Sequence, residues 1–349
     1  MRFRLDPLTR ERFRRFRSIR RAWVSLWILA ALVGLSLVAE LLVNSRAIAV
    51  WYHGRLYLPT YDRVRFGDEF GLGYHYEASY RELARAVWKD GSGWVLLPPV
   101  PYNPLEQNFR KGSYPPYAPS WSDRHFLGTD QIGRDVLARL FYGFRIAILF
   151  SMAFVLLTFL AGTLLGILMG YAGGWFDLLV QRIIEIWEQI PFLYIVMIVV
   201  SIFQPDFLVF LLIFVVFGWT ARTWAVRAMT YRERERDYVR AARTMGASTW
   251  RIVRVHILPN ILVVVLTALP FAVESGIGSL TALDYLGFGL RPPTPSWGEL
   301  IGEGISTYQT APWIIISVVS AITIVLVLIA FIGEGLRDAF DPKRFTVFE

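Results

Sequence analysis

Cysteine is absent from the 349 residues of this sequence. Its absence excludes disulfides, thiolate ligands for a metal and cysteine nucleophiles. Histidine is scarce, and the four copies are scattered without the spacing of a metal site: His53, His75, His125 and His256. No nucleophile stands beside a base in the sequence pattern. We therefore predict neither a metal site nor catalysis by this chain.

Lysine is rare as well, and this bears on ATP binding. A phosphate-binding loop requires the pattern Gly-x4-Gly-Lys-Ser/Thr. The lysines are Lys89, Lys111 and Lys343, and none stands in that pattern. We expect no ATP binding by this route. The formal net charge is +8, which in a membrane protein reflects topology and attraction to anionic lipid and is no evidence for nucleic-acid binding.

Long apolar runs, in contrast, are abundant. Hydrophobic residues make up 55% of the chain and the mean hydropathy is +0.43, above the values of ordinary soluble domains. A run of about 20 apolar residues is long enough to cross a bilayer as a helix. The sequence predicts an all-α polytopic membrane protein with six transmembrane helices, at about residues 22–43, 142–171, 184–203, 207–229, 260–283 and 312–333.

An arginine cluster sets the predicted orientation. Residues 1–21 are rich in arginine, so the positive-inside rule places them in the cytoplasm. The apolar run that follows is longer than the core of a signal peptide and lacks a small-residue cleavage site. Alternation of the spans places the loop at 230–259 and the tail at 336–349 in the cytoplasm. It places residues 44–140 outside, before a core domain at 141–335.

Residues 44–140 form a predicted outer insert. They are rich in Tyr, Trp, Gly and Pro, which favours turns and short strands, such as 93–97, over long helices. At the end of the insert, Thr129 or Asp130 is expected to cap an amphipathic helix that lies on the outer membrane surface. Two interpretations stay open: the insert binds a partner protein, or it is a lid packed on the membrane domain.

A polar stretch at residues 237–260 interrupts the apolar runs. Its pattern predicts two short helices joined at Gly246, a left-handed C-cap, with Pro259 in the first turn of a further helix. The first helix is expected to present an apolar face and two small residues, so that another protein can come close. Those residues are Tyr238, Ala242 and Met245, with Ala241 beside Ala242. The alternative is a solvated basic loop.

This stretch resembles the cytoplasmic coupling loop of bacterial ABC importer permeases, which reads Glu-Ala-Ala, three residues, Gly, about nine residues and Leu-Pro. Ala241, Ala242, Gly246, Leu258 and Pro259 match that pattern, and Arg240 departs from its Glu. The resemblance implies an ATPase-coupling loop. We expect it to be carried by Tyr238, Arg240, Ala241, Ala242, Met245, Gly246, His256, Leu258 and Pro259.

A second segment narrows the resemblance. Residues 127–143 fit the pattern LGTD-x-x-GRDV-x-x-R-x-x-YG, which resembles the signature before the second span of dipeptide and oligopeptide permeases. Residues 170–177, 284–299 and 333–342 resemble further segments of the same family. The long aromatic outer insert resembles most the permeases of microcin C and oligopeptide importers.

The resemblance implies the type I importer permease fold and one half of a pore for peptides, either oligopeptides or a microcin C-like peptide. The implied partners are a second permease subunit in a heterodimer, two ATPase subunits or a fused double ATPase, and a periplasmic substrate-binding protein. ATP is then bound by partner subunits, and this chain needs no cofactor. The implied location is the bacterial inner membrane, with both termini cytoplasmic. The alternative is a non-transporting scaffold or receptor with an outer partner-binding domain.

Ionisable residues within the apolar spans are candidate functional sites because charge is costly in hydrocarbon. Glu274, followed by Ser275, lies in a span loosened by nearby Pro and Gly. We hypothesise that Glu274 faces the translocation path and favours cationic groups of peptides; a protonated Glu in an interhelical hydrogen bond is the equal alternative. Glu188 and Gln189 are expected near the inner mouth, where they form a gate or extend to the interface.

Overall fold

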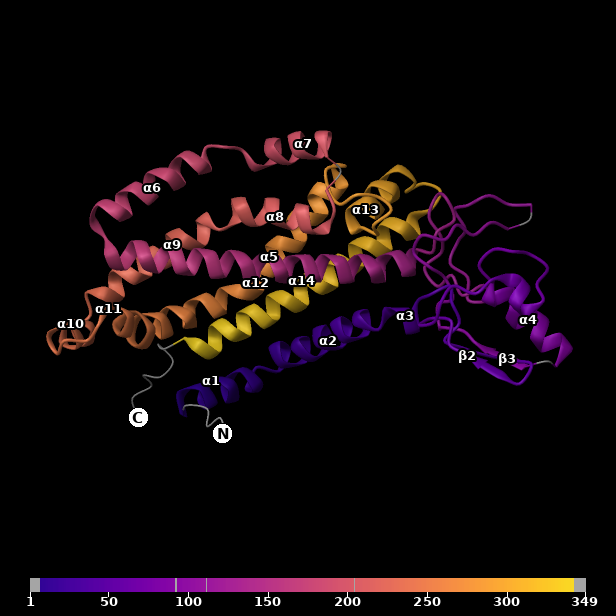
Figure 1. Ribbon diagram of the computed structural model, residues 1–349, viewed down its shortest axis with the longest axis horizontal. Helices are drawn as coiled ribbons and strands as arrows, with labels where there is room; N and C mark the ends of the chain where they lie inside the picture. Colours follow the sequence, from indigo (N-terminus) through magenta and orange to yellow (C-terminus); the bar gives the residue numbers. More distant parts are fainter. Residues whose placement is uncertain (1–6, 92, 111, 204, 342–349) are drawn as a thin grey trace.

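The computed structural model describes residues 7–91, 93–110, 112–203 and 205–341. Long helices run side by side in an elongated bundle, and a small α/β insert lies at one end (Figure 1). Helix α1, Pro7–Ser18, lies at the opposite end, as does the end of α14, Pro312–Phe340. The insert is therefore at one end of the bundle, and α1 with the end of α14 is at the other.

Six segments of the described chain are apolar and long enough to cross a membrane, if one bent helix pair counts as a single span. The bent pair is α6 and α7, whose axes differ by 64°. Pro191 stands at the break and disfavours helical backbone at the residue before it. The spans are α2 (Arg20–Leu37), α5 (Val136–Ala172), α6 with α7 (Gly174–Glu188, Phe192–Ile202), α8 with α9 (Phe207–Gly218, Thr220–Arg234), α12 (Leu258–Tyr285) and α14.

Helix α5 lies at the centre of the bundle and packs closely on α9. Gly162, Gly166 and Gly170 stand one turn apart on the contact, and a Cβ atom at any of them would lie under 3.0 Å from α9 or the residue before it. Small residues at this spacing let two helix backbones approach in a membrane. The two helices therefore act as one rigid unit.

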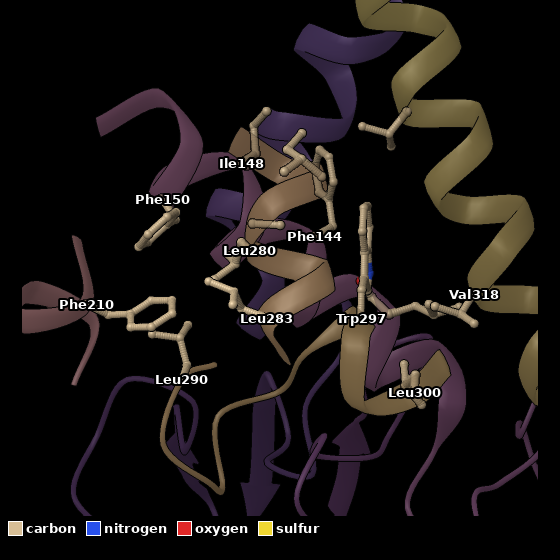
Figure 2. Packing of buried hydrophobic residues seen from close by; sticks show 14 of the residues in the cluster. Phe144, Ile148, Phe150, Phe210, Leu280, Leu283, Leu290, Trp297, Leu300 and Val318 are labelled. Atoms are coloured by element: carbon tan, nitrogen blue, oxygen red, sulfur yellow. The ribbon is translucent and has the colours of Figure 1, made fainter. Parts of the chain in front are cut away.

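The main apolar core lies in the half of the bundle next to the insert. Phe144 and Phe150 of α5, Phe210 of α8 and Leu280 of α12 meet there (Figure 2). Trp297 of α13 (Trp297–Ser306) closes the core and donates its indole N–H to the Leu140 carbonyl at 2.9 Å. A second cluster at the other end joins α5, α9 and α12.

The insert is an antiparallel three-stranded sheet with the order β2-β1-β3, flanked by one helix. Helix α4 packs Leu83 and Val87 against Val50 of β1 and Phe70, forming a separate small core. A short helix, α3, connects α2 to the insert. The bounds are α3 (Ala39–Leu42), β1 (Ala49–Tyr52), β2 (Arg55–Tyr57), η1 (Gly67–Phe70), α4 (Tyr80–Asp90) and β3 (Gly93–Leu96).

The structure corrects several expected boundaries. No separate amphipathic helix precedes α5 in the described chain: α5 begins at Val136 and is capped by Asp135, whose carboxylate accepts from the Ala138 N–H at 2.7 Å. Thr129 and Asp130, the expected caps, are buried in the preceding loop. Helix α6 begins at Gly174, ten residues before the predicted start at 184, because its polar first turn pairs with α9.

Candidate coupling site and translocation path

The candidate coupling site is helix α10, Asp237–Thr244, at the end of the bundle opposite the insert (Figure 1). It ends in a Schellman motif: the Gly246 N–H donates to the Arg243 carbonyl and the Ala247 N–H to the Ala242 carbonyl, both at 3.0 Å. Gly246 has a φ of +80°, a conformation that glycine adopts without strain. The predicted left-handed cap at Gly246 is confirmed.

The second predicted short helix is not separate. Its residues form α11 (Thr249–Arg251) and a π-helical stretch, η2 (Ile252–Ile257), which continue into α12. Pro259 lacks the N–H that an α-helical bond would need, and the wider π turn precedes it. The chain that follows α10 is thus one continuous helical stretch that runs through η2 into α12.

The two alanines of the coupling motif lie in different environments. Ala242 is only 5% exposed and packs with Val239 against the buried face of η2, whereas Ala241 is exposed. Successive residues of a helix point about 100° apart, so the predicted joint surface of both alanines is wrong. Tyr238 and Ala241 lie at exposed positions of α10, and Met245, the residue after its end, is 81% exposed.

Polar contacts hold α10 to its neighbours. The Tyr238 hydroxyl donates to Glu233 of α9 and accepts from the Asn260 amide at 2.9 Å. Burial, with the Glu233 contact, raises the pKa of Tyr238. Arg240 pairs with Glu235 at 2.9 Å, and this hydrogen bond lowers the pKa of that exposed carboxyl. Arg240 therefore makes an internal contact at the position where the motif has Glu.

The other predicted coupling residues lie beside this helix. The His256 ring centroid is 6.1 Å from that of Tyr238, and the described contacts include no hydrogen bond of the imidazole. Leu258 is half-buried, and Pro259 is exposed. His256 thus packs beside Tyr238.

An ion pair that sequence reasoning missed connects α9 to α6. Arg227 binds buried Asp177 twice, Nε to Oδ1 at 2.5 Å and Nη2 to Oδ2 at 2.7 Å. One turn further towards α10, Tyr231 also donates to Asp177, and Arg234 donates to the Tyr171 carbonyl at the end of α5 at 3.1 Å. We call the pair of Arg227 and Asp177 the inner clamp. It joins α9, the helix before α10, to the start of the bent span formed by α6 and α7.

Glu274 lies half-buried on α12 and makes no hydrogen bond or ion pair within the described part of the chain. Ser275 is exposed, while Gly276 faces α5, where an added Cβ would lie 3.0 Å from Ser151. The exposed side of this helix carries small residues: Ser275, Gly278, Ser279 and Ala282. Glu274 therefore borders a side of α12 that its own bundle does not cover.

Glu188 and Gln189 lie at the break between α6 and α7. Glu188 accepts a hydrogen bond from the Trp224 indole at 3.1 Å, and Gln189 is exposed at the C-cap of α6. This break lies midway along the bundle, beside the junction of α8 and α9 (Figure 1). The expectation that both residues lie near the inner mouth is wrong, because α6 starts earlier than predicted and brings its end to mid-depth.

A buried charge cluster stands at the other end of the bundle, and we call it the outer lock. Arg139, 1% exposed, contacts Asp130 at 2.6 Å, Glu299 at 2.7 Å and Glu303 at 2.8 Å. Arg134 also pairs with Asp130 and Glu303, each at 2.6 Å. Burial raises the pKa of Glu303. The lock fastens α13 to α5, and its signal in the sequence was the GTD-x-x-GRDV-x-x-R run.

Comparison with known proteins identifies the class. Residues 162–346 match the family model described as "Binding-protein-dependent transport system inner membrane component". An Escherichia coli (strain K12) protein named "Inner membrane ABC transporter permease protein YejE" is 42% identical over 98% of this chain and 99% of its own length. The chain belongs to this family.

Two further relatives extend the comparison of this permease. The Agrobacterium fabrum "Peptidoglycan transport system permease protein YejE" is 38% identical over 97% of this permease and 94% of its own length. The Haemophilus influenzae "Dipeptide transport system permease protein DppC" is 36% identical over 71% of this permease and 85% of its own length. The predicted all-α polytopic membrane architecture and the inner-membrane location are confirmed, and the permease is a pore-forming, non-catalytic subunit.

Proposed function

We propose that this permease forms half of the pore of a peptide importer and that the exposed face of α10 docks an ATPase subunit. The observation that carries the proposal is the placement of α10. Ala241 and Met245 are exposed on its outer side, while Val239 and Ala242 on its inner side pack in one cluster with η2 and α12. A docked partner that moves α10 therefore moves the spans.

The proposed substrates are peptides, because relatives that cover most of the chain are named as dipeptide, oligopeptide and peptidoglycan permeases. Within that class, oligopeptides or a microcin C-like peptide are the narrower proposal. Glu274 supports this, since a carboxyl without an internal partner beside an uncovered face of α12 suits a cationic terminus or side chain. Ser275 lines the same proposed path.

We propose that a second permease subunit, in a heterodimer, packs on the side of the bundle that this chain itself leaves exposed. The bent pair exposes large apolar side chains over its whole length, including Trp175, Ile186, Tyr194 and Ile202. Lipid covers part of this apolar surface, but the exposed side of α12 carries small residues, two of them serines, that suit a pore. We propose that Glu188 and Gln189, at the break in the bent pair, gate that pore at mid-depth.

The remaining partners follow from the proposed role. Two ATPase subunits, or a fused double ATPase, bind ATP and supply the energy, so no cofactor is assigned to this chain. A periplasmic binding protein delivers the peptide. We propose that both termini are cytoplasmic, in support of which α1, α10 and the end of α14 lie at the same end of the bundle (Figure 1). The transport family makes a non-transporting scaffold the weaker alternative.

The test is to make the exposed face of α10 bulky and charged. Ala241→Arg with Met245→Glu changes two exposed positions, so the bundle is expected to stay folded while co-purification of the ATPase falls about tenfold, as for interface hot spots. Arg232→Ala, an exposed change on α9, is the matched control and should retain the ATPase. Full retention of the ATPase by the α10 variant would contradict the proposal.

A further inference from the structure

The outer insert contains a cleft with a volume of about 960 Å³. One wall is helix α4, a second is strand β3, and the third is the loop that carries Phe109, Arg110 and residues 122–125. The cleft lies at the outer end of the bundle, away from the inner clamp and α10 (Figure 1). No step proposed above uses it.

The walls of this cleft are strongly basic. Five cationic side chains line it, against the two carboxylates of Glu82 and Asp123. Two of the five are held internally: Arg81 pairs with Glu106, and Arg110 pairs with Asp123 at 2.5 Å. The other three have no ionic partner among the residues that the structure describes, namely Arg85, Lys89 and Arg124.

The arrangement of these cations costs stability. Arg81, Arg85 and Lys89 stand four residues apart on one face of α4, and like charges at that spacing destabilise a helix by about 0.2–0.5 kcal/mol per pair. Arg124 has a φ of +59°, a left-handed conformation that few residues other than glycine adopt. Unpaired charge and backbone strain at one cleft indicate that an outside partner uses it.

Exposed aromatic side chains surround the same cations. Trp88 is 89% exposed and Phe109 is 65% exposed, and Trp94 of β3 completes the rim. Aromatic residues together with Arg are the types that dominate protein–protein interfaces. A small solute enclosed in a pocket would leave such rim side chains in water, whereas a protein surface covers them.

The floor of the cleft is rigidly joined to the membrane domain. Tyr102 stacks on His125 with ring centroids 3.9 Å apart, and the His125 ring bonds Asp135 at 2.7 Å. Asp135 is the N-cap of α5. A protein held in the cleft is therefore connected through buried contacts to the central helix of the bundle.

We propose that the cleft lined by Arg85, Lys89 and Arg124 docks an acidic surface of the periplasmic binding protein, so that the insert holds this partner beside the pore entrance. This inference rests on the proposed importer function. It commits the insert to a binding role instead of a lid. The partner's carboxylates occupy the positions beside the three cations, and its apolar side chains cover Trp88 and Phe109.

The test uses the whole importer complex in nanodiscs, with the periplasmic binding protein of that importer as the probe. Arg85→Glu with Lys89→Glu should weaken binding at least about tenfold at low salt, because the two new glutamates then face the carboxylates of the binding protein. Wild-type affinity should fall as the salt rises from about 50 to about 500 mM, and that of the variant should change little. The matched control is Arg55→Glu, an exposed insert arginine outside the cleft, with an effect of less than about twofold.

Two outcomes separate this proposal from the importer function. Unchanged affinity of the Arg85→Glu, Lys89→Glu complex overturns the docking role, and stimulation of ATP hydrolysis by the binding protein then shows that the importer function still stands. A second variant, Trp88→Ala, should weaken binding without changing its salt dependence. If tri-glutamate binds the wild-type complex and not the charge-reversed one, while binding-protein affinity is equal in both, the cleft takes small acids and the docking role is overturned.

Discussion

The two ends of this permease are held together by different physics. At the outer end, Arg139 is buried in a cluster of carboxylates that joins α13 to α5. At the inner end, α10 is a short helix with an exposed side, and it ends in a glycine turn. Buried charges resist separation because an unpaired one is expensive. We infer from this comparison that the outer end stays fixed while α10 moves.

The variant Arg139→Ala tests the outer lock and has the largest expected effect. It removes the fully buried cation of the cluster and leaves only Arg134 to pair with Asp130 and Glu303, so we expect a loss of about 3–5 kcal/mol in the free energy of unfolding. Arg145→Ala, which removes a half-exposed pair with Glu40, is the control and should cost about 0–1 kcal/mol. Denaturant titration in nanodiscs measures both. Equal losses of unfolding free energy in the two variants would show that the outer lock stabilises the fold no more than a half-exposed ion pair does.

The inner clamp should affect transport more than stability. Arg227→Ala removes both hydrogen bonds from Arg227 to Asp177 and leaves only the one from Tyr231, so that α6 is held less firmly to α9. We expect peptide uptake to fall about tenfold while ATP hydrolysis continues, and Arg227→Lys to recover only part of the uptake because it lacks the planar two-pronged contact. Uptake and hydrolysis are measured together in liposomes.

The control for the clamp is Arg182→Ala, which removes an exposed pair with Glu185 on the same helix α6. It should leave both uptake and hydrolysis near the wild-type values. Equal, proportionate losses of uptake and hydrolysis in Arg227→Ala would mean that the pair only stabilises the fold.

Gly246→Val tests the turn beyond α10. The space around Gly246 is open, so the penalty comes only from the positive φ, roughly 1–3 kcal/mol for a residue other than glycine. We expect α10 to be displaced and hydrolysis to become uncoupled from transport. Gly246→Asn, which tolerates this conformation, should keep most of the coupling. Equal behaviour of the two variants in reconstituted liposomes would show that the turn geometry is unimportant.

The smallest effect is expected at Arg240. Its pair with Glu235 is exposed on both sides, and exposed pairs contribute little. The lowered pKa of Glu235 means that this small stabilisation is present above the ordinary Glu pKa and is lost as the pH falls through the lowered value. Arg240→Ala should therefore change hydrolysis by less than about twofold. A severe loss would assign a direct ATPase contact to Arg240.

Sequence reasoning located the elements better than their faces. The six spans and the Gly246 cap depend on local patterns, apolar length and glycine punctuation, which a sequence displays directly. The exposure of Ala241 and the burial of Ala242 depend on how α10 packs against η2. The outer lock and inner clamp join residues that are 164 and 50 positions apart, Arg139 with Glu303 and Arg227 with Asp177. Helical spacing carries no information on such pairs.

The absence of cysteine permits a direct test of the central claim, that α10 meets the ATPase. A single substitution, Met245→Cys, places one exposed thiol beside α10, and Tyr61→Cys places one on an exposed part of the outer insert away from the cleft as a control. We predict that only Met245→Cys forms a cross-link to the ATPase in intact cells and that only Tyr61→Cys reacts with a membrane-impermeant maleimide. Labelling of Met245→Cys from outside, or a cross-link between the ATPase and Tyr61→Cys, would contradict the account.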